Sequence, residues 1–264
     1  MLIMRAFSSE WVKLRRRRLW FGSYGAIAGV VVLTTVVTIA GAAANAGRHP
    51  AGTLTLAMLA QPTGLSRGLT QTGILLGAVA LSIAAAQFGG EFSHGTLRNL
   101  LMRAPRRASL IAGNGLAVLS FLVGAVVVAA VVDIGAAFAM AQLRGVATGA
   151  WTSGSAMASL GEIVGDVAIS VCGYAIVGMV LGVLLRSSVI AIAAGLALLL
   201  PVESIIASAV PSTARWLPGQ LLQSLARGGS PQAGFGAALA TMSIYLAGIV
   251  VLALVAFTRR DVTA

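Results

Sequence analysis

Charged side chains are scarce in this sequence: only 9% of its 264 residues are Asp, Glu, Lys or Arg. A soluble domain carries about 25% of such residues, so this scarcity excludes an ordinary water-soluble fold. In their place the chain is 58% hydrophobic, and its mean hydropathy is +0.95. We therefore expect a membrane protein that crosses the bilayer several times.

Lysine, cysteine and histidine are nearly absent, and each gap removes a class of site. The single lysine, Lys13, follows Val12, whereas a P-loop needs a Gly-Lys-Ser/Thr run whose lysine reaches the terminal phosphates. The single cysteine, Cys172, can form neither a disulfide framework nor a cysteine metal site by itself. His49 and His94 are far apart, and no HExxH motif occurs. We expect no catalytic residue, no metal site and no cofactor bound by this chain.

Acidic residues are also few, 7 against 18 Lys and Arg, which gives a net charge of +11. In a soluble protein this excess would suggest nucleic acid, but no recognition motif for DNA or RNA occurs. Basic residues collect on the cytoplasmic side of membrane proteins, and we expect the charge to have this topological origin.

The first uncharged run, residues 19–47, has 29 residues. A secretory signal core has about 7 to 15, so the run predicts a retained transmembrane helix.

Charges delimit six apolar segments, each of which can supply the roughly 20 residues that a membrane-spanning helix needs. All six should be helices, because open strands leave backbone groups unpaired in lipid. We expect one all-α membrane domain over residues 1–264. The predicted spans are Leu19–Ala43, the residues between Arg67 and Glu91, Arg107 to about Met140, Glu162–Leu185, Ser187–Ala209 and Phe235–Phe257.

The basic residues divide unequally between the two sides of this layout. Of the 18, 13 fall on the side of the two termini. The positive-inside rule therefore predicts a multi-pass protein with both termini in the cytoplasm. The arginine-rich, lysine-poor composition suggests a high-GC bacterium, and so the bacterial cytoplasmic (inner) membrane. The five on the other side are Arg48, Arg67, Arg144, Arg215 and Arg227.

The segment MLIMRAFSSEWVKLRRRR, residues 1–18, has an apolar face. Ile3, Phe7, Trp11 and Leu14 recur at spacings of 4, 4 and 3, which is a helical period. We expect an interfacial helix that lies in the headgroup plane with its basic side toward anionic lipid. The alternative is a basic cluster that only sets the topology.

The segment between spans two and three, residues 91–106, also has a helical pattern. Glu91 stands near its start and the arginines stand later, which suits the helix dipole, and Pro105 would end the helix. Such a helix can dock into a groove on a cytoplasmic partner. A stop-transfer loop with incidental helical bias is equally compatible. Phe92, Thr96, Leu97, Leu100 and Leu101 can share one face.

Residues 211–234 are interrupted by three prolines and contain the partly apolar piece WLPGQLLQSL. The segment is too short to cross the membrane and return, so we expect an outer helical hairpin that lies at the surface or re-enters it. Trp216 suits the membrane interface.

Four carboxylates lie in or near the spans, where charge is costly and often functional. Glu203 and Asp133 are candidates for a transport path; reaching the outer headgroups or pairing with an outer arginine are the alternatives. The other two, Glu162 and Asp166, open span four.

Six Gly-xxx-Gly pairs occur where chance gives about four, so they predict no particular helix contact. They include Gly25/Gly29, Gly73/Gly77 and Gly178/Gly182.

The stretch E-F-S-H-G-T-L-R-N-L-L-M-R-A-P-R-R resembles the loop after the second span in ABC exporter permeases of the type-two class. The opening S-E-W-V-K-L-R is similar to the N-terminal connecting helix of that family, and F-T-R-R-D-V, residues 257–262, to its exit from the sixth span. Each motif is short, but the three occur in the family's order and the six-span layout covers the whole chain. The matching residues are Glu91, Gly95, Thr96, Leu97, Leu100, Leu101 and Pro105 in the loop, and Glu10, Trp11, Lys13 and Leu14 near the start.

The resemblance implies an exporter subunit that borrows its energy. Residues 91–106 would be the coupling helix, with the N-terminal helix as a second contact to an ABC ATPase subunit. The assembly would hold two permease copies, as a homodimer or a related pair, and two ATPase subunits that bind ATP and Mg. Spans one, two and five would line the path, and residues 211–234 would cap its outer side. The implied ATPase contacts are Glu91, Phe92, Gly95, Thr96, Leu97, Leu100, Leu101, Phe7, Glu10 and Trp11.

Two other functions remain open on the sequence. An ion- or proton-coupled secondary transporter would use Glu203 and Asp133, although no inverted repeat is evident. A membrane scaffold would transport nothing. By analogy with the family, the cargo of an exporter with so apolar an interior would be amphipathic, such as a drug or peptide antibiotic.

Overall fold

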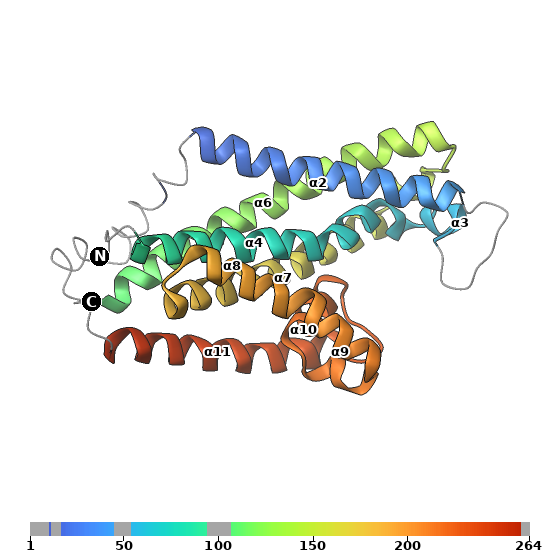
Figure 1. Ribbon diagram of the computed structural model, residues 1–264. Helices are drawn as coiled ribbons and strands as arrows, with labels where there is room; N and C mark the ends of the chain where they lie inside the picture. The colour runs from blue at the N-terminus through green and yellow to red at the C-terminus, as the bar shows by residue number, and fades with distance from the viewer. Residues whose placement is uncertain (1–10, 12–16, 45–53, 94–106, 260–264) are drawn as a thin grey trace.

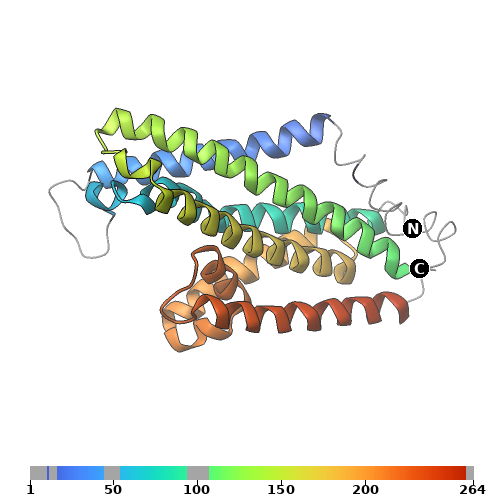
Figure 2. The same cartoon turned by 180° about the vertical axis from the view of Figure 1, so that it is seen from behind.

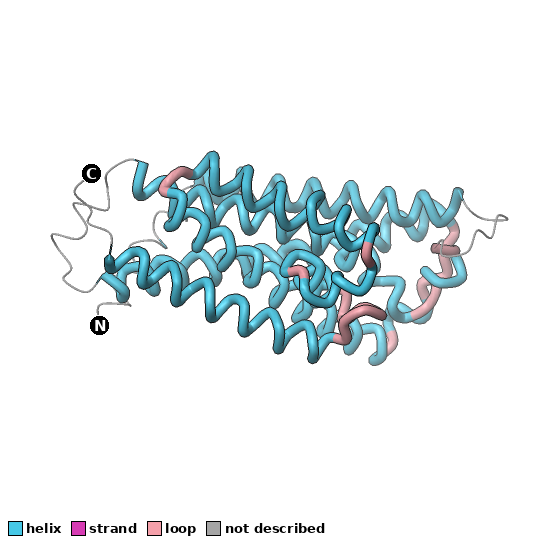
Figure 3. The backbone as a smooth tube through the Cα atoms, turned by 60° about the horizontal axis from the view of Figure 1, so that its bottom comes forward, coloured by secondary structure: helices cyan, strands magenta, loops and turns pink. Residues whose placement is uncertain are grey.

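The computed structural model describes residue 11 and residues 17–44, 54–93 and 107–259. Nearly all of this part is helical (Figure 3), and six of its helices are long and apolar enough to cross a membrane. The prediction of an all-α chain with six candidate spans is confirmed. The elements are α2 (Arg17–Ala44), α3 (Leu56–Leu59), η1 (Pro62–Ser66), α4 (Arg67–Ser93), α6 (Arg107–Arg144), η2 (Gly149–Thr152), α7 (Gly154–Leu185), α8 (Ser188–Ala197), η3 (Leu198–Val202), α9 (Glu203–Ala209), η4 (Pro211–Trp216), α10 (Pro218–Ala226) and α11 (Phe235–Arg259).

The long helices form one bundle with α4 at its centre (Figure 1). The most extensive contact is between α4 and α7, and α2 packs on α6 and α4. At the other side of the bundle, α11 lies against α7 and α10. The start of α2, the end of α4, the start of α6 and the end of α11 all lie at one end of the bundle (Figures 1 and 2), which we call the terminal end. The opposite end holds α3, η1, η2 and the short helices α9, η4 and α10.

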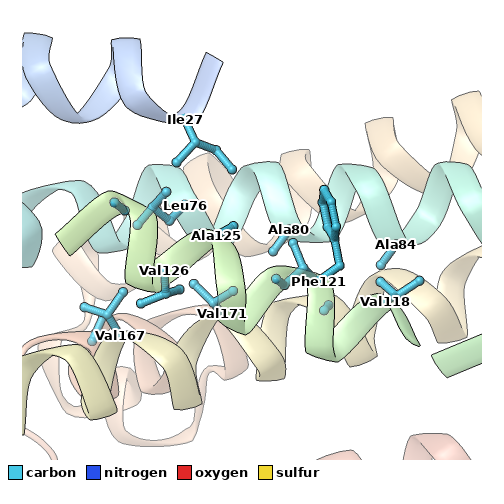
Figure 4. Packing of buried hydrophobic residues seen from close by; sticks show 14 of the residues in the cluster. Ile27, Leu76, Ala80, Ala84, Val118, Phe121, Ala125, Val126, Val167 and Val171 are labelled. Atoms are coloured by element: carbon cyan, nitrogen blue, oxygen red, sulfur yellow. The ribbon is translucent and has the colours of Figure 1, made fainter. Parts of the chain in front are cut away.

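The main hydrophobic core lies between α2, α4, α6 and α7. Figure 4 shows Ile27, Leu76, Phe121 and Val171, one from each helix, turned toward a common centre. The outward faces of the bundle are apolar as well: Val131 and Ile244 are 64% and 70% exposed. A surface with this much exposed hydrocarbon is expected of a helix bundle that lipid surrounds.

Glycines allow α4 and α7 to pack closely. A Cβ atom at Gly178 would overlap the backbone of Leu81, and one at Gly182 would lie 2.9 Å from the backbone nitrogen of Gly89. By contrast, a Cβ atom at Gly25 or Gly29 in α2 would meet nothing within 4 Å. Of the Gly-xxx-Gly pairs in the sequence, the Gly178/Gly182 pair is therefore a true helix contact of the kind that small residues make in membranes.

Two predicted span boundaries are wrong, and local capping explains both. Span four begins at Gly154 rather than Glu162, because the Ser153 hydroxyl accepts a hydrogen bond (3.2 Å) from the Ala156 N–H and caps the helix there. Span three continues past Met140 to Arg144 and ends where Gly145 adopts φ +66°. With 38 residues, α6 is about 57 Å long, which exceeds the roughly 45 Å of a whole bilayer.

The fifth span is interrupted rather than straight. Its helix begins as expected, with Ser187 as the N-cap of α8, but residues Leu198–Val202 form one π-helical turn around Pro201. Proline removes a backbone hydrogen bond from a helix, which explains the break. The chain then continues as α9, and the corner that follows is helical in η4 and α10.

Most residues of the two predicted contact segments lie outside the described part of the chain. Trp11 is a helical residue and is 37% exposed. Glu91 and Phe92 do not start a separate helix, since α4 continues through them to Ser93. Phe7, Glu10, Gly95, Thr96, Leu97, Leu100 and Leu101 lie outside the described residues.

Candidate functional site

The first polar site in the bundle surrounds Asp133 of α6, which is fully buried. Its carboxylate accepts a hydrogen bond from the Thr35 hydroxyl of α2 (2.5 Å) and one from the Leu69 backbone N–H of α4 (2.9 Å). Leu69 is the third residue of α4, so its N–H has no partner within the helix. Asp133 thus caps α4 from a neighbouring helix, and its carboxyl group faces the positive end of the α4 dipole.

Neighbouring residues make room for this cap. A Cβ atom at Gly68 would overlap both the Asp133 carboxylate and the Thr35 hydroxyl, so only glycine fits there. One turn further along α4, the Thr72 hydroxyl donates to the Gly68 carbonyl (2.7 Å) and lies 2.5 Å from the Thr34 hydroxyl. We call Thr34, Thr35, Gly68, Thr72 and Asp133 the three-helix polar cluster, because it joins α2, α4 and α6.

The second polar site surrounds Glu203, the first residue after the π-helical turn. Its carboxylate is 3% exposed and accepts hydrogen bonds from the Gly219 N–H (2.6 Å) and the Gln220 N–H (3.1 Å). These are the second and third residues of α10, so Glu203 caps α10 as Asp133 caps α4. Gly219 is required here too, because a Cβ atom on it would overlap the Leu199 carbonyl oxygen.

Both candidate transport-path residues therefore have a structural partner. Neither the Asp133 nor the Glu203 carboxylate bonds to an arginine among the described residues; each bonds to the first turn of a helix. The outer-arginine alternative does not apply to these two residues in the described part of the chain. Sequence reasoning singled out the carboxylates but missed Thr35, Gly68 and Gly219, because threonine and glycine are common in membrane helices and carry no distinctive pattern.

An aromatic contact joins the loops at the end of the bundle opposite the terminal end. Trp151 of η2 is fully buried, and its indole N–H donates to the Leu59 carbonyl (2.9 Å). Its ring meets that of Phe138 edge to face, with centroids 5.3 Å apart. This contact ties the α3–η1 segment to α6 and α7, and it was not anticipated from the sequence.

Two apolar hollows flank α11. The larger, of about 620 Å³, lies between α7, α8, η3, α10 and α11, and we call it the α11 groove. The smaller, of about 370 Å³, lies between α4, α6, α7 and α11 and is lined by Phe88, Met179 and Leu254 among others. In both the described lining residues are almost wholly apolar, so neither can hold a polar metabolite or a metal ion.

The described residues contain no group of three His, Cys, Asp or Glu side chains that could hold a metal ion. Cys172 is a free, partly buried thiol in α7.

Comparison with known proteins gives one finding. A protein-family model described as "Protein of unknown function (DUF2705)" matches residues 64–263, which include every described element from α4 to α11. No curated protein matches the sequence.

Proposed function

Since the chain belongs to DUF2705, a family described only as proteins of unknown function, we propose from its own residues that it is the permease subunit of an ATP-driven ABC exporter. It would move an amphipathic, drug-like or antibiotic-like substrate out of a bacterial cell with energy from a separate ATPase. The chain itself would bind no nucleotide, and ATP and Mg would be held by the ATPase subunits.

One observation carries this proposal: the helix ends that adjoin the three family-like segments all lie at the terminal end of the bundle. Residues 94–106 connect the end of α4 to the start of α6, residues 10–14 precede the start of α2, and residues 257–262 begin in the last turn of α11. All four helix ends lie at the terminal end (Figures 1 and 2). Six crossings and a common end for these segments are what a single ATPase-binding face requires.

The packing of α4 supports a mechanical role for the segment that follows it. The helix is continuous from Arg67 to Ser93, capped at one end by Asp133 and packed along its length on α7. A force applied beyond Ser93 would therefore move α4 together with α7 rather than bend it. At Gly178 and Gly182 the backbones of the two helices lie in close contact, which couples α4 to α7.

The finer features of the proposal follow from the same layout. The terminal end would face the cytoplasm of a bacterium, with the N-terminal helix on the inner leaflet of its inner membrane. Two copies of the chain would assemble with two ATPase subunits. The η4–α10 corner, residues 211–234, would form the re-entrant outer hairpin that caps the path.

The secondary-transporter alternative is less well supported. Such a carrier needs a carboxylate that exchanges its ion or proton as the protein moves. Asp133 and Glu203 each accept hydrogen bonds from the first turn of a helix, which holds each carboxyl group in place. The structure thus gives both carboxylates a use that does not involve transport.

We expect a gene for an ABC ATPase to adjoin this one, and copurification of that ATPase with the chain tests the proposal. We expect the ATPase to bind the chain in detergent, and the Glu91→Arg and Gly95→Pro variants to lose it. Glu162→Arg is the matched control, because Glu162 is an exposed carboxylate near the start of α7, at the opposite end of the bundle. Retention of the ATPase by both the Glu91→Arg and the Gly95→Pro variants would exclude the docking role. Substrate transport by the purified chain without ATPase would exclude the proposed function.

A further inference from the structure

We propose that the α11 groove is a binding site for an amphiphile with a hydrocarbon chain and an anionic head, which enters it sideways from the bilayer. This inference goes beyond the proposed export function and needs only a membrane around the chain. It rests on the lining of the groove, on its opening and on the charge at one end.

The interior of the groove accepts only hydrocarbon. Its described lining residues include no charged side chain, and its two polar-tipped residues are Trp216 and Tyr245. The Tyr245 hydroxyl donates to the Trp216 carbonyl (3.2 Å), so its hydrogen is already used. A volume of about 620 Å³ falls within the range of pockets that enclose drug-sized ligands. A polar ligand would lose its hydration there and gain few hydrogen bonds.

The groove opens on the face that lipid covers. Leu198, Ile244 and Leu252 line it and are 55%, 70% and 65% exposed, so their outer surfaces continue directly into the apolar exterior. The opening arises because α11 is the least covered of the six candidate spans. In α11, 17% of the apolar 18-residue stretch is buried, against 56% in α7. An acyl chain can therefore move from the bilayer into the groove without crossing polar surface.

One end of the groove carries a positive charge. Trp216 and Pro218 line this end, and the guanidinium carbon of Arg215 lies 5.4 Å from the centroid of the Trp216 ring. Arg215 is exposed in η4, which directly follows the last helix of the interrupted fifth span. A basic residue beside an interfacial tryptophan is suited to an anionic headgroup. The charge thus selects an anionic amphiphile over a neutral one.

Photolabelling of the purified chain in phosphatidylcholine nanodiscs, with no ATPase present, tests the site. The probe is palmitic acid with a diazirine in its chain, and the neutral comparison is the corresponding monoacylglycerol. Mass spectrometry should place the label on peptides 177–184 and 244–252. Labelling at Leu33 and Val37, which are exposed on α2, gives the reference for surrounding lipid.

Two glycines of α11 give a matched pair of variants. Gly248 lines the groove and a Cβ atom there would meet nothing within 4 Å, so we expect Gly248→Phe to fill the groove without disturbing the fold. Gly236 has equal space and does not line the groove. We expect Gly248→Phe to lower groove labelling roughly fivefold relative to α2, Gly248→Leu to lower it less, and Gly236→Phe to leave it unchanged.

The charge is tested with Arg215→Gln. We expect this change to lower labelling by palmitic acid about fivefold while labelling by the monoacylglycerol stays the same. Equal labelling of the groove and α2, unchanged labelling in Gly248→Phe, or no preference for the acid would each overturn the proposal. A change of oligomeric state in Gly248→Phe would also overturn it, by making the groove a contact between copies. Since no ATPase is present, these outcomes are independent of the exporter hypothesis.

Discussion

The side chain of Asp133 connects three helices that are distant in the sequence. It accepts hydrogen bonds from Thr35 in α2 and from the first turn of α4, while its own backbone belongs to α6. The whole side chain is buried, so water cannot replace a lost partner. At this scale the stability of the bundle depends on one buried carboxyl group that faces one helix terminus.

Replacing the Asp133 carboxyl group tests its contribution to stability directly. We expect Asp133→Ala to lower the free energy of unfolding by about 2 to 4 kcal/mol, because the helix loses its cap and two buried donors lose their acceptor. Asp133→Asn keeps an acceptor oxygen and should lose about half as much. The measurement is unfolding of the detergent-purified chain with increasing denaturing detergent.

Glu162→Ala provides the control for charge removal, since Glu162 is an exposed carboxylate on α7. Its effect should stay within about 0.5 kcal/mol. If Asp133→Ala behaves like Glu162→Ala, the cap contributes nothing to stability and the three-helix polar cluster has another role.

At the scale of elements, the contact between α4 and α7 is the most extensive in the bundle. It depends on residues without side chains: Gly178 and Gly182 in α7 lie against the α4 backbone, and Gly77 in α4 accommodates the ring of Tyr174. Backbone atoms cannot move aside as a side chain can. The contact should therefore tolerate no enlargement.

We expect Gly178→Leu to destabilise the protein by about 3 kcal/mol or to prevent its accumulation, because the side chain would overlap the backbone of Leu81. Gly165→Leu is the matched control on the same helix, because a Cβ atom at Gly165 would meet nothing within 4 Å. Thermal unfolding in detergent, followed by size-exclusion chromatography, measures both. Equal stability of the two variants would mean that α4 and α7 do not pack as described.

At the scale of the whole molecule, the two ends of the bundle differ in what they carry. The helix ends that adjoin the family-like segments lie at the terminal end, whereas the opposite end holds the three-helix polar cluster, the Trp151 contact and the short helices α9 and α10. In the proposed orientation the first end faces the cytoplasm and the second faces outward.

Cysteine labelling in intact cells tests this orientation. In a Cys172→Ser background, Ser155→Cys lies at the exposed start of α7 and should react with a membrane-impermeant maleimide. His94→Cys, just beyond α4, should react only after the cells are permeabilised. The opposite pattern would place the proposed ATPase face outside the cell and contradict the exporter hypothesis.

The sequence predicts the spans well because charge and hydropathy determine where a helix can lie in lipid. It misplaces the start of α7 because Glu162 looks like a boundary, whereas the Ser153 cap starts the helix eight residues earlier. The π-helical turn at Pro201 and the caps by Asp133 and Glu203 could not be predicted, since each depends on the distance between helices. The two carboxylates were recognised as unusual, but only the structure identifies their partners.

The cap on α4 has a consequence for biosynthesis. Leu69 is translated 64 residues before Asp133, so α4 leaves the ribosome without the carboxylate that completes its first turn. The Leu69 N–H can gain this acceptor only after α6 has been made and brought alongside. We therefore expect the capped form of α4 to appear late in synthesis, when the first three spans have come together.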